Sequence, residues 1–569
     1  MGVPRFVCVR RSFSSRVSIG RHSKSGAGAG SMKVVDAVAD ILKREGMEVL
    51  VAYPRNPIIE ACAQADIRTV IVRQERTGLH MAEALSRVTS GRRIGVFAMQ
   101  QGPGTENAFG GVAQAFGDSA PILVLPGGYP RHLRVEPNFN AFLNFQHVTK
   151  HVEQANAPAA VPDVLRRAFS QLRNGRPRPV MVEFPVDVMA EETDPSGYRP
   201  VRAARTAPDP QDLARAAEAL VAAQRPVIYA GQGVHYAQAW SQLRELAELL
   251  EAPVTTSLPG KSAFREDHPL SLGTSGNTKR KPVLDFLEKS DVIFGVGCSF
   301  AATSFDVVIP KGKKVIHATS DASDFNANVE VEYPLVGDAA LTLEALLAEV
   351  RDRLGGKPRG RFGDVAGEVR SAKESWLAQW MPKMTAAETP INPYRVIWDL
   401  AHTVDVANTI ITHDAGSPRT QLVPWWPAVS PMSFIGWSKT TQLGSGLGFA
   451  LGAKLAQPDK LCINVWGDAA IGFTGMDFET AVRERLPILS ILLNNFAMAA
   501  ELDVMKAATA KFRSTDISGN YANLARDLGG YAERIEDPKD IVPAIQRAVR
   551  QTQEGTPALL EFITQQVTY

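Results

Sequence analysis

One short stretch constrains the fold of this chain more than any other, because it reads as two buried strands joined by a helical segment. Leu461–Trp466 is apolar and runs into a glycine and Asp468, whereas Ile488–Leu493 is equally apolar and runs into a pair of asparagines ending at Asn495. Between them, Phe478–Arg485 predicts one or two helical turns. Strands that are apolar throughout are typical of a parallel sheet covered by helices, so the pattern predicts a βαβ unit. Because successive parallel strands end at the same edge of a sheet, we expect Asp468 and Asn495 to lie together there, where such sheets bind ligands.

The residues at this expected edge suit a metal ion and a phosphate group. A carboxylate and an amide oxygen are hard ligands that Mg²⁺ prefers, and Mg²⁺ usually takes its remaining ligands from water and phosphates. Gly467, just before Asp468, lets the backbone approach a phosphate closely. The alternative interpretation is a purely structural βαβ unit with an ordinary asparagine turn.

Strand and helix patterns alternate along most of the chain. At 569 residues the chain is too long for one hydrophobic core. The alternation predicts an α/β fold with three doubly wound parallel-sheet domains. The domain boundaries that we expect are 32–189, 190–352 and 392–569, with a linker over 353–391.

Residues 1–31 differ from the rest of the chain in composition. They contain six lysines and arginines, many serines and no acid. This composition is typical of a mitochondrial transit peptide. The alternative is a dispensable tail or a wrongly chosen start codon, with Met32 as the true start. We prefer the second interpretation, which predicts a cytoplasmic protein, whereas a real transit peptide would predict a mitochondrial one.

The overall composition narrows the classes of function. The 62 lysines and arginines nearly balance the 60 acids, which argues against a nucleic-acid partner. No apolar stretch approaches the roughly 20 residues of a membrane span, so we expect no membrane partner. The four cysteines, Cys8, Cys62, Cys298 and Cys462, lack metal-ligand spacing and fit a reducing compartment.

The 461–495 motif resembles that of the thiamine diphosphate (ThDP) enzymes, in which a G-D-x run is followed by an N-N pair. The resemblance implies that Asp468, Asn495 and the backbone carbonyl of Ala497 hold Mg²⁺. Ala469 stands where the family more often has glycine, a change that acetolactate synthases share. The first domain is also similar to that of acetolactate synthase, on the segments RQERTGLHMAEALSRVTSGRRIGV, QQGPGTENAFGGVAQAFGDSAPILVLPG and FQHVTKH. The three domains would then be the pyrimidine-binding, central and diphosphate-binding domains of that family.

The resemblance assigns catalytic roles to two residues. Glu75 matches the glutamate that hydrogen-bonds the aminopyrimidine ring of ThDP and favours its imino tautomer. Gln146 matches a glutamine placed over the thiazolium ring, although it could equally be a surface residue. The other cofactor-binding residues that the resemblance implies are Tyr53, Pro103, Asn107, Ala415, Gly416, Ser417, Thr441, Leu443, Gly467, Asp468, Ala469, Ala470, Asn495, Ala497 and Met498. The resemblance implies that Leu443 occupies the slot of the bulky side chain that bends ThDP into its V shape; the alternative is an ordinary core leucine.

The central domain departs from acetolactate synthase. The turn Gly231-Gln232-Gly233 before a helix can cradle a phosphate, and acetolactate synthases carry FAD in this domain. However, the arginine-rich G-A-R-F-D-D-R run of those enzymes is replaced here by 297–303, which has neither arginine. FAD is therefore a doubtful cofactor. We expect His317, His402 and His413 to be structural or surface residues rather than acid–base groups.

The resemblance implies a homodimer or homotetramer, with Glu75 of one chain serving the metal site of its partner. The implied reaction is ThDP- and Mg²⁺-dependent decarboxylation of a pyruvate-like 2-oxo acid, followed by ligation to a second carbonyl. The acceptor-selecting tryptophan of acetolactate synthases is missing, because no tryptophan follows Trp466. This leaves open a non-ligating 2-oxo acid decarboxylase or lyase. Rivals of other classes are a flavin-linked pyruvate oxidoreductase, a silent paralogue, and a dinucleotide-binding protein built on the Gly231 turn.

Overall fold

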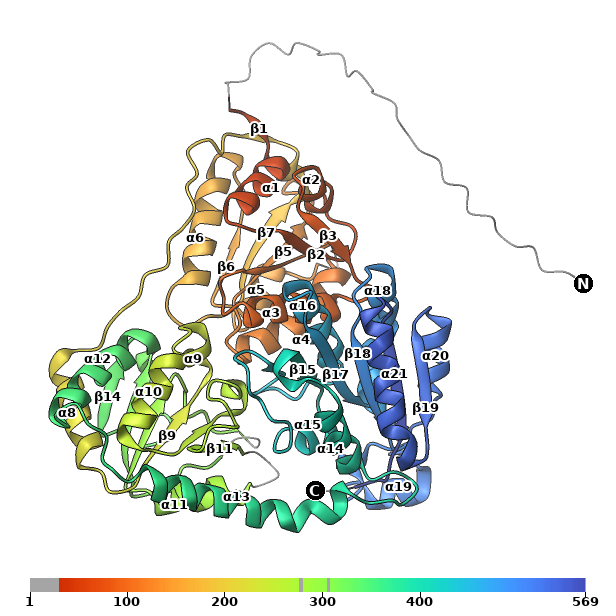
Figure 1. Cartoon of the computed structure of the whole chain (residues 1–569). Coiled ribbons are helices and arrows are strands. Elements are labelled where there is room, and N and C mark those ends of the chain that lie inside the picture. Colours follow the sequence, from red (N-terminus) through yellow and green to blue (C-terminus); the bar gives the residue numbers. More distant parts are fainter. Residues whose placement is uncertain (1–29, 137, 276–279, 304–306, 568–569) are drawn as a thin grey trace, which may run out of the picture.

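The computed structural model describes residues 30–567, apart from residue 137 and residues 276–279 and 304–306. The predictions for 1–29 and for Cys8 fall outside the described residues. Figure 1 shows three α/β lobes, with the N-terminal domain above the central and C-terminal domains. Each lobe contains a six-stranded sheet whose neighbouring strands are parallel, so the predicted fold class is confirmed.

The N-terminal domain carries its strands in the order β3-β2-β4-β5-β7-β6. The strands are β2 (Val49–Ala52), β3 (Arg68–Ile71), β4 (Gly95–Met99), β5 (Ile122–Gly128), β6 (His151–Gln154) and β7 (Val180–Pro185). The helices are α1 (Val34–Arg44), α2 (Ile58–Gln64), α3 (Glu75–Val88), α4 (Pro103–Gly117), α5 (Ala141–Phe145), α6 (Val161–Arg173) and α7 (Val186–Met189). A two-stranded antiparallel ribbon, β1 (Met32–Lys33) with β8 (Glu192–Thr193), joins the two ends of this domain.

The C-terminal domain repeats this topology, with strand order β16-β15-β17-β18-β20-β19. The strands are β15 (Thr409–His413), β16 (Phe434–Ile435), β17 (Leu461–Gly467), β18 (Leu489–Asn494), β19 (Tyr531–Ile535) and β20 (Ala558–Ile563). The helices are α14 (Pro393–Thr403), α15 (Ser417–Leu422), α16 (Ser445–Ala456), α17 (Asp468–Thr474), α18 (Phe478–Arg483), α19 (Lys506–Phe512), α20 (Tyr521–Asp527) and α21 (Ile541–Gln553). The strand order reverses between β15 and β17, which opens a crevice at the carboxyl edge there. Helix α17, which begins at Asp468, was not predicted.

The central domain has a different strand order, β11-β10-β9-β12-β13-β14. Its strands are β9 (Pro226–Ala230), β10 (Val254–Thr256), β11 (Ser271–Thr274), β12 (Val292–Val296), β13 (Lys314–Thr319) and β14 (Tyr333–Val336). Its helices are α8 (Pro210–Ala222), α9 (Gln232–Tyr236), α10 (Trp240–Leu250), α11 (Lys281–Lys289) and α12 (Ala339–Arg353). This is the dinucleotide-binding order, so topology alone leaves the nucleotide question open.

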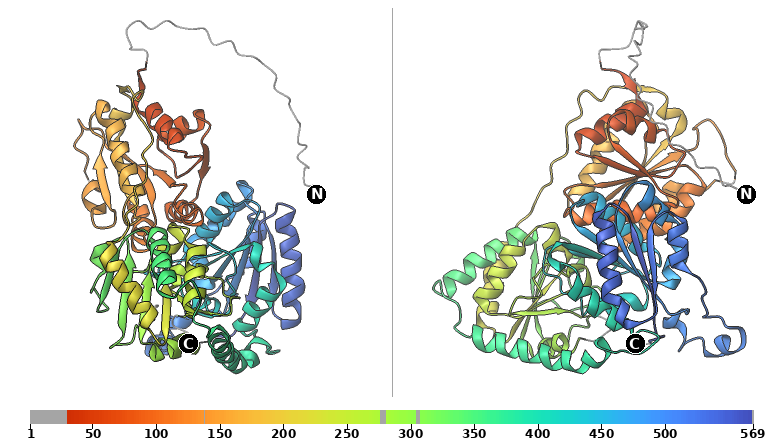
Figure 2. Two further views of the ribbon diagram at one scale, coloured as in Figure 1. Left: turned by 60° about the vertical axis from the view of Figure 1, so that its left-hand side comes forward. Right: turned by 45° about the vertical axis from the view of Figure 1, so that its right-hand side comes forward.

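Two connections tie the lobes together. An extended segment after β8 descends from the N-terminal to the central domain, and the long helix α13 (Phe362–Met384) runs below the central domain to the C-terminal one (Figure 2). Trp376 of α13 stacks on Trp425, with ring centroids 4.2 Å apart and planes 10° apart. The α13 helix therefore reaches the C-terminal domain through an aromatic contact.

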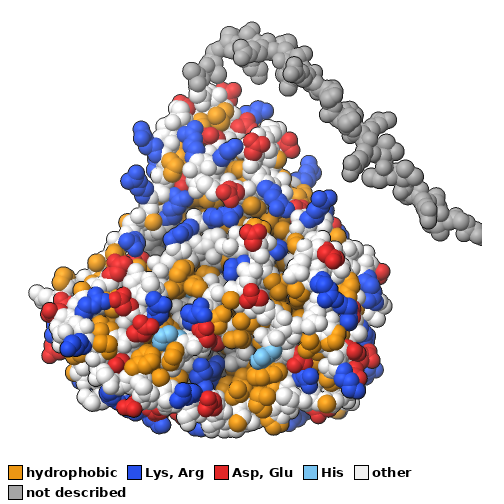
Figure 3. All heavy atoms as spheres, in the orientation of Figure 1, with side chains coloured by type: hydrophobic (Ala, Val, Ile, Leu, Met, Phe, Trp, Pro, Cys, Tyr) orange, Lys and Arg blue, Asp and Glu red, His pale blue; other side chains and the backbone are white. Residues whose placement is uncertain are grey.

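The surface mixes charges of both signs. Lysine, arginine, aspartate and glutamate side chains are interspersed over the face drawn in Figure 3, with apolar side chains between them. Within the described residues, no helix combines the length and apolar composition needed to cross a bilayer.

The N- and C-terminal domains meet where α3 packs against α16. A methyl group added at Gly452 of α16 would lie 2.2 Å from the carbonyl oxygen of Met81, and one at Gly448 would lie 2.8 Å from that of Thr77. Beside this contact, the buried Asp118 accepts hydrogen bonds from the backbone N–H groups of Ser438 and Lys439. Burial raises the pKa of Asp118 to about 6. The sequence G-x-x-x-G in α16 thus lets two domains approach backbone to backbone.

We predict that Gly452→Ala separates α3 from α16, because the obstacle is backbone that cannot move aside. The expected cost is about 1–3 kcal/mol, typical of overpacking, and is measured as a lower thermal unfolding midpoint. The control is Gly367→Ala within α13, where a methyl group meets nothing within 4 Å. This control should stabilise the helix by roughly 0.5–1 kcal/mol. Equal midpoints for the two variants would contradict the prediction.

Candidate active site

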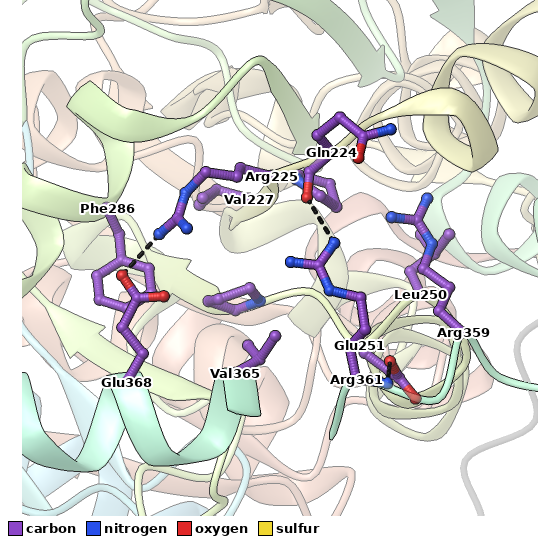
Figure 4. A pocket seen from close by; sticks show the side chains of 12 residues that line it. Gln224, Arg225, Val227, Leu250, Glu251, Phe286, Arg359, Arg361, Val365 and Glu368 are labelled. Carbon is purple, nitrogen blue, oxygen red and sulfur yellow. Dashed lines mark hydrogen bonds and ion pairs between the residues drawn. The ribbon is translucent and has the colours of Figure 1, made fainter. Parts of the chain in front are cut away.

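Two pockets are found among the described residues, and the smaller one is a gap where three elements of the structure meet. It lies between the first residues of β9, the end of α10 and the start of α13, and holds only about 30 Å³ (Figure 4). The charged side chains that line this pocket bind to the protein itself: Arg225 pairs with Glu368 at 2.6 Å, and Arg361 donates to the carbonyl of Gln224 at 3.1 Å. A space of this size holds about one water molecule.

The larger cavity, of about 320 Å³, opens at the carboxyl edge of the C-terminal sheet. Its walls come from the segments that follow β15, β17 and β18, so it occupies the crevice where the strand order reverses. It brings together the predicted residues Ala415, Gly416, Ser417, Thr441, Leu443, Gly467, Asp468, Ala469, Ala470, Asn495, Ala497 and Met498. Lining residues that sequence reasoning missed include Pro418, Arg419, Gln421, Trp437 and Glu501.

One buried carboxylate sets the shape of this cavity. Asp414, at the end of β15, is fully buried and accepts hydrogen bonds from the N–H groups of Ala415 (2.7 Å), Gly444 (2.9 Å) and Gly446 (2.7 Å). Burial raises the pKa of Asp414 to about 6, although these N–H groups lower it. The carboxylate thereby joins the loop after β15 to the turn that begins α16.

A glycine with a positive φ angle lies in each of the two segments that Asp414 joins. Gly416 has φ +85° and Gly444 has φ +89°, a region in which only glycine is unstrained. A methyl group at Gly444 would also lie 2.6 Å from Cβ of Phe473. The turn at Gly444 places Leu443 and Thr441 on one wall of the cavity, facing Ala415–Ser417 on another.

The residues expected to hold Mg²⁺ come together at the ends of β17 and β18, a place called the corner below. The side-chain oxygens of Asp468 and Asn495 both accept a hydrogen bond from the backbone N–H of Ala497, Asp468 Oδ2 at 3.2 Å and Asn495 Oδ1 at 3.0 Å. Burial raises the pKa of Asp468 to about 6, while the N–H groups of Ala469 and Ala497 lower it. The corner thus gathers a carboxylate, an amide oxygen and backbone groups.

The predicted residues of the N-terminal domain form a separate group. Glu75 is the first residue of α3 and is only 3% exposed. Burial raises the pKa of Glu75, and Asp477 adds to the rise, whereas a hydrogen bond from Asn107 opposes it. Pro103 begins α4, the helix that carries Asn107. Among the residues that the structure describes, none from this domain lines the large cavity.

The remaining two predicted residues lie at loop positions. Tyr53 follows β2 and is half-buried, with its N–H bonded to the carbonyl of Ala98 at 3.0 Å. Gln146 ends α5 and is exposed to solvent. Both belong to the N-terminal domain, so neither reaches the cavity of its own chain.

Comparison with known proteins assigns all three domains. Residues 32–157 match the model described as thiamine pyrophosphate enzyme, N-terminal TPP binding domain. Residues 213–346 match the central domain of the same enzymes, and residues 414–562 match their C-terminal TPP binding domain. Thiamine pyrophosphate is another name for ThDP. The chain belongs to the ThDP-dependent enzymes.

Full-length relatives refine this assignment. A probable acetolactate synthase large subunit of Methanococcus aeolicus is 30% identical, over 93% of this chain and 92% of that protein. Acetolactate synthase isozyme 3 large subunit of Escherichia coli is 28% identical, over 93% of both chains. Glyoxylate carboligase of Escherichia coli O157:H7 is 28% identical, over 94% of both chains. The protein is therefore a ThDP-dependent enzyme of the acetolactate synthase-like type.

The corner of this ThDP-dependent enzyme suits a magnesium diphosphate. The oxygens of Asp468, Asn495 and the Ala497 carbonyl are the hard donor set that Mg²⁺ prefers, and they leave positions for phosphate and water. The atom nearest to a methyl group added at Gly467 is Cγ of Pro418 at 3.5 Å, an ordinary van der Waals contact, so the backbone there is open. The carboxylate, the amide and this open backbone fit the diphosphate end of the cofactor.

His317, His402 and His413 contact aromatic rings or backbone carbonyl groups. His413 lies buried between Phe434 and Trp437, with ring centroids 5.5 and 5.9 Å away, and burial lowers its pKa to about 3. His317 is buried and bonds to the carbonyl of Cys298 at 2.9 Å. His402 is exposed and bonds to a carbonyl of its own helix. These environments agree with the interpretation that none of the three is an acid–base group.

We predict that Asp414→Asn loosens the cofactor cavity, because an amide group replaces one of the oxygens that accept the three N–H groups. A buried donor left without an acceptor costs about 1–3 kcal/mol, so both the thermal midpoint and ThDP affinity should fall. The control is Asp405→Asn. Asp405 lies just before the start of β15, is exposed, and accepts a hydrogen bond from the N–H of Ala407 at 3.1 Å. Asparagine caps equally well at such a site. Unchanged ThDP affinity in Asp414→Asn, measured by calorimetry, would contradict the role given to Asp414.

Proposed function

We propose that the enzyme decarboxylates a pyruvate-like 2-oxo acid and joins the remaining fragment to a second carbonyl compound. The observation that carries this proposal is the corner of Asp468, Asn495 and Ala497 in a cavity of cofactor size. The names of the relatives, acetolactate synthase and glyoxylate carboligase, support carboligation of 2-oxo acids. Mg²⁺ bound at this corner would hold the diphosphate.

The bound cofactor supplies a thiazolium ring that accepts the electron pair left when a 2-oxo acid loses CO₂. The protein supplies the surroundings. Asp468 and Asn495 would hold the metal, and the backbone at Gly416–Ser417 would bind the diphosphate. Leu443 would support the bend between the two rings.

We propose that Glu75 is supplied by a second copy of the chain. In support, the described lining of the cavity comes from the C-terminal domain, and the described residues of the same chain's N-terminal domain do not contribute to it. Large apolar side chains are exposed beside each half: Phe473 and Met476 are each 48% exposed after Asp468, and Phe109 is 37% exposed on α4. We propose that these side chains lie in the interface between the two copies. A homodimer with two shared sites, or a tetramer of two such dimers, satisfies both observations.

We predict that the wild-type enzyme, given ThDP, Mg²⁺ and pyruvate, releases one CO₂ for each acetolactate formed. Glu75→Gln should lose activity while still binding ThDP, because the glutamine cannot hold the proton at the pyrimidine. Asp468→Asn should lose both activity and Mg²⁺-dependent ThDP binding. CO₂ release is followed together with product identity by mass spectrometry.

Mixing these two inactive variants tests the shared site. A hybrid dimer combines Glu75 of one chain with Asp468 of the other and so contains one intact site. Co-expressed variants should regain about a quarter of wild-type activity, because half of the dimers are hybrids with one site each. A mixture that stays inactive would show that each site is built within one chain. Turnover of no 2-oxo acid by wild-type enzyme that binds ThDP would refute the substrate class.

The alternative function, a flavin-linked pyruvate oxidoreductase, needs a site for FAD, and the Gly231–Gly233 turn of the central domain offers little room for one. A methyl group at Gly231 would lie 2.3 Å from the carbonyl oxygen of Gly297, and the N–H of Gly233 already donates to that oxygen at 2.7 Å. Phe300 stacks on Tyr229 with centroids 5.5 Å apart. Because the chain's own backbone packs onto the turn, we propose that the enzyme works without FAD.

Glu501 favours a second candidate function, decarboxylation with release of an aldehyde. Asp468 and Glu501 are the two acidic side chains among the described residues that line the cavity. Asp468 is committed to the metal corner, which leaves Glu501 to deliver a proton to the carbon that has lost CO₂. Protonation there competes with attack on a second carbonyl.

For the second candidate function, in which the wild-type enzyme releases aldehyde, we predict that Glu501→Gln shifts the products from aldehyde to ligated product, because it removes the proton donor. General acid catalysis is worth about 100-fold or more, so a fall of at least about tenfold in the aldehyde fraction is expected. Asp503→Asn, two residues away and exposed, is the matched control and should leave the ratio unchanged. The same product ratio in wild type and Glu501→Gln would remove Glu501 from this role.

A further inference from the structure

An exposed arginine at the carboxyl edge of the N-terminal sheet has no part in the chemistry described so far. The N-terminal strand order reverses between β2 and β4, just as the C-terminal order reverses between β15 and β17. The C-terminal reversal opens the cofactor cavity, and the segment after β15 lines it. The corresponding N-terminal segment follows β2 and contains Arg55, which is exposed. The topology therefore places Arg55 where a doubly wound sheet binds its ligand.

A buried asparagine fixes the segment that carries Arg55. Asn56 is 5% exposed, and its Nδ2 donates to the carbonyls of Met99 and Leu125, both at 2.9 Å. Its Oδ1 accepts a hydrogen bond from the N–H of Ile58 at 3.0 Å. Met99 ends β4 and Leu125 belongs to β5, so these bonds hold the segment against two neighbouring strands. The backbone beside Arg55 is therefore anchored to the sheet.

The same edge of the sheet carries Glu75. Arg55 follows β2 and Glu75 follows β3, and these paired parallel strands end opposite each other at Ala52 and Ile71. A methyl group added at Gly104, which follows β4, would lie 3.5 Å from Glu75 Oε1. The segments after β2, β3 and β4 therefore meet at one edge. Arg55 accompanies Glu75 to the cofactor that this carboxylate serves, whether in its own chain or in a second copy.

The charged neighbours of Arg55 along this edge are bound to one another. In the segment after β5, Arg131 pairs with Asp187 at 2.8 Å, and Arg134 pairs with Glu136 at 2.5 Å. Within the part of the chain that the structure describes, no ion pair or hydrogen bond joins the side chain of Arg55 to another residue. A guanidinium binds a carboxylate through two parallel hydrogen bonds, so Arg55 suits an anionic ligand.

The proposed reaction brings two carboxylates to this edge, one on each 2-oxo acid. The donor loses its carboxylate as CO₂, so the negative charge leaves that group as the carbon–carbon bond breaks. A cation bound there would stabilise the donor more before the reaction than in the transition state, and would slow the reaction. The acceptor keeps its carboxylate in the product. We propose that Arg55 binds the carboxylate of the acceptor and thereby selects a 2-oxo acid over a neutral aldehyde.

The identity of this ligand rests on the proposed carboligation, whereas the first test measures binding alone. Glu75→Gln enzyme, loaded with ThDP and Mg²⁺ and expected to be inactive, is titrated with 2-oxobutanoate in a calorimeter. Adding Arg55→Gln should weaken binding by about 10- to 100-fold, as expected for loss of hydrogen bonds between charged groups. The matched control adds Arg92→Gln instead, because Arg92 is exposed just before the start of β4, at the opposite edge of the same sheet. This control should leave the affinity unchanged.

The second test compares two acceptors that differ by the carboxylate, 2-oxobutanoate and propanal, with pyruvate as donor. Arg55→Gln should raise the KM for 2-oxobutanoate by about 10- to 100-fold. The KM for propanal, and the rate of CO₂ release at saturating propanal, should stay at the wild-type values. Arg55→Lys keeps the charge but loses the planar fork, so its KM for 2-oxobutanoate should lie between the two. Arg92→Gln should behave as wild type with both acceptors.

Four results would overturn the proposal. Equal affinity for 2-oxobutanoate with and without Arg55 would remove the contact, and so would a Glu75→Gln enzyme that binds no 2-oxobutanoate. A KM raised equally for both acceptors would make Arg55 structural. Slower CO₂ release at saturating propanal would assign Arg55 to the donor. By contrast, binding that depends on Arg55, in a protein whose wild type turns over no 2-oxo acid, would refute the proposed reaction and support the carboxylate site.

Discussion

The site depends on one buried carboxylate. Asp414 accepts three backbone N–H groups within 2.9 Å, and these come from two segments separated by about thirty residues of chain. Its own N–H is bonded to the carbonyl of Val465 in β17, so the carboxylate is fixed to the sheet. The loop at Gly416 and the turn at Gly444 are therefore set by the same side chain. One carboxylate thus joins the two walls of the cavity.

The helix that starts at this turn also decides how the domains meet. Gly448 and Gly452 of α16 remove the side chains that would hold α3 away, and the two helices touch backbone to backbone. Glu75 is the first residue of α3, so the contact that positions α16 also positions this residue. Glu75 is not among the described residues that line the cavity of its own chain. The packing therefore agrees with the proposal that two copies share each site.

Sequence reasoning succeeded where a pattern has a local cause. The strands expected at 461–466 and 488–493 are observed as β17 and β18 to within one residue at each end, because each is a short apolar run bounded by turn residues. Helix α17 was missed because Asp468–Thr474 is rich in small residues and has no apolar period. Strand β6 (HVEQ) was missed because it is a polar edge strand. Arg419 and Glu501 were missed for another reason: whether a side chain lines a cavity is decided by the tertiary fold, and neither stands in a motif.

The site combines a rigid part with an adjustable one. Asp468 and Asn495 follow the ends of paired strands, so a substitution among them disturbs the sheet as well as the corner. The wall at 497–501 is held largely by local bonds: the N–H of Ala499 donates to the carbonyl of Ala497, and that of Glu501 to the carbonyl of Met498, both at 2.9 Å. Its first two residues join it to the rest of the domain, because Ala497 N–H donates to Asp468 Oδ2 and Met498 N–H to Thr515 O. Such a segment can change its side chains at little cost to the fold, which is where loops acquire function. The cofactor motif thus stands on the rigid part of the site, whereas the side chains at 497–501 can vary without disturbing the sheet.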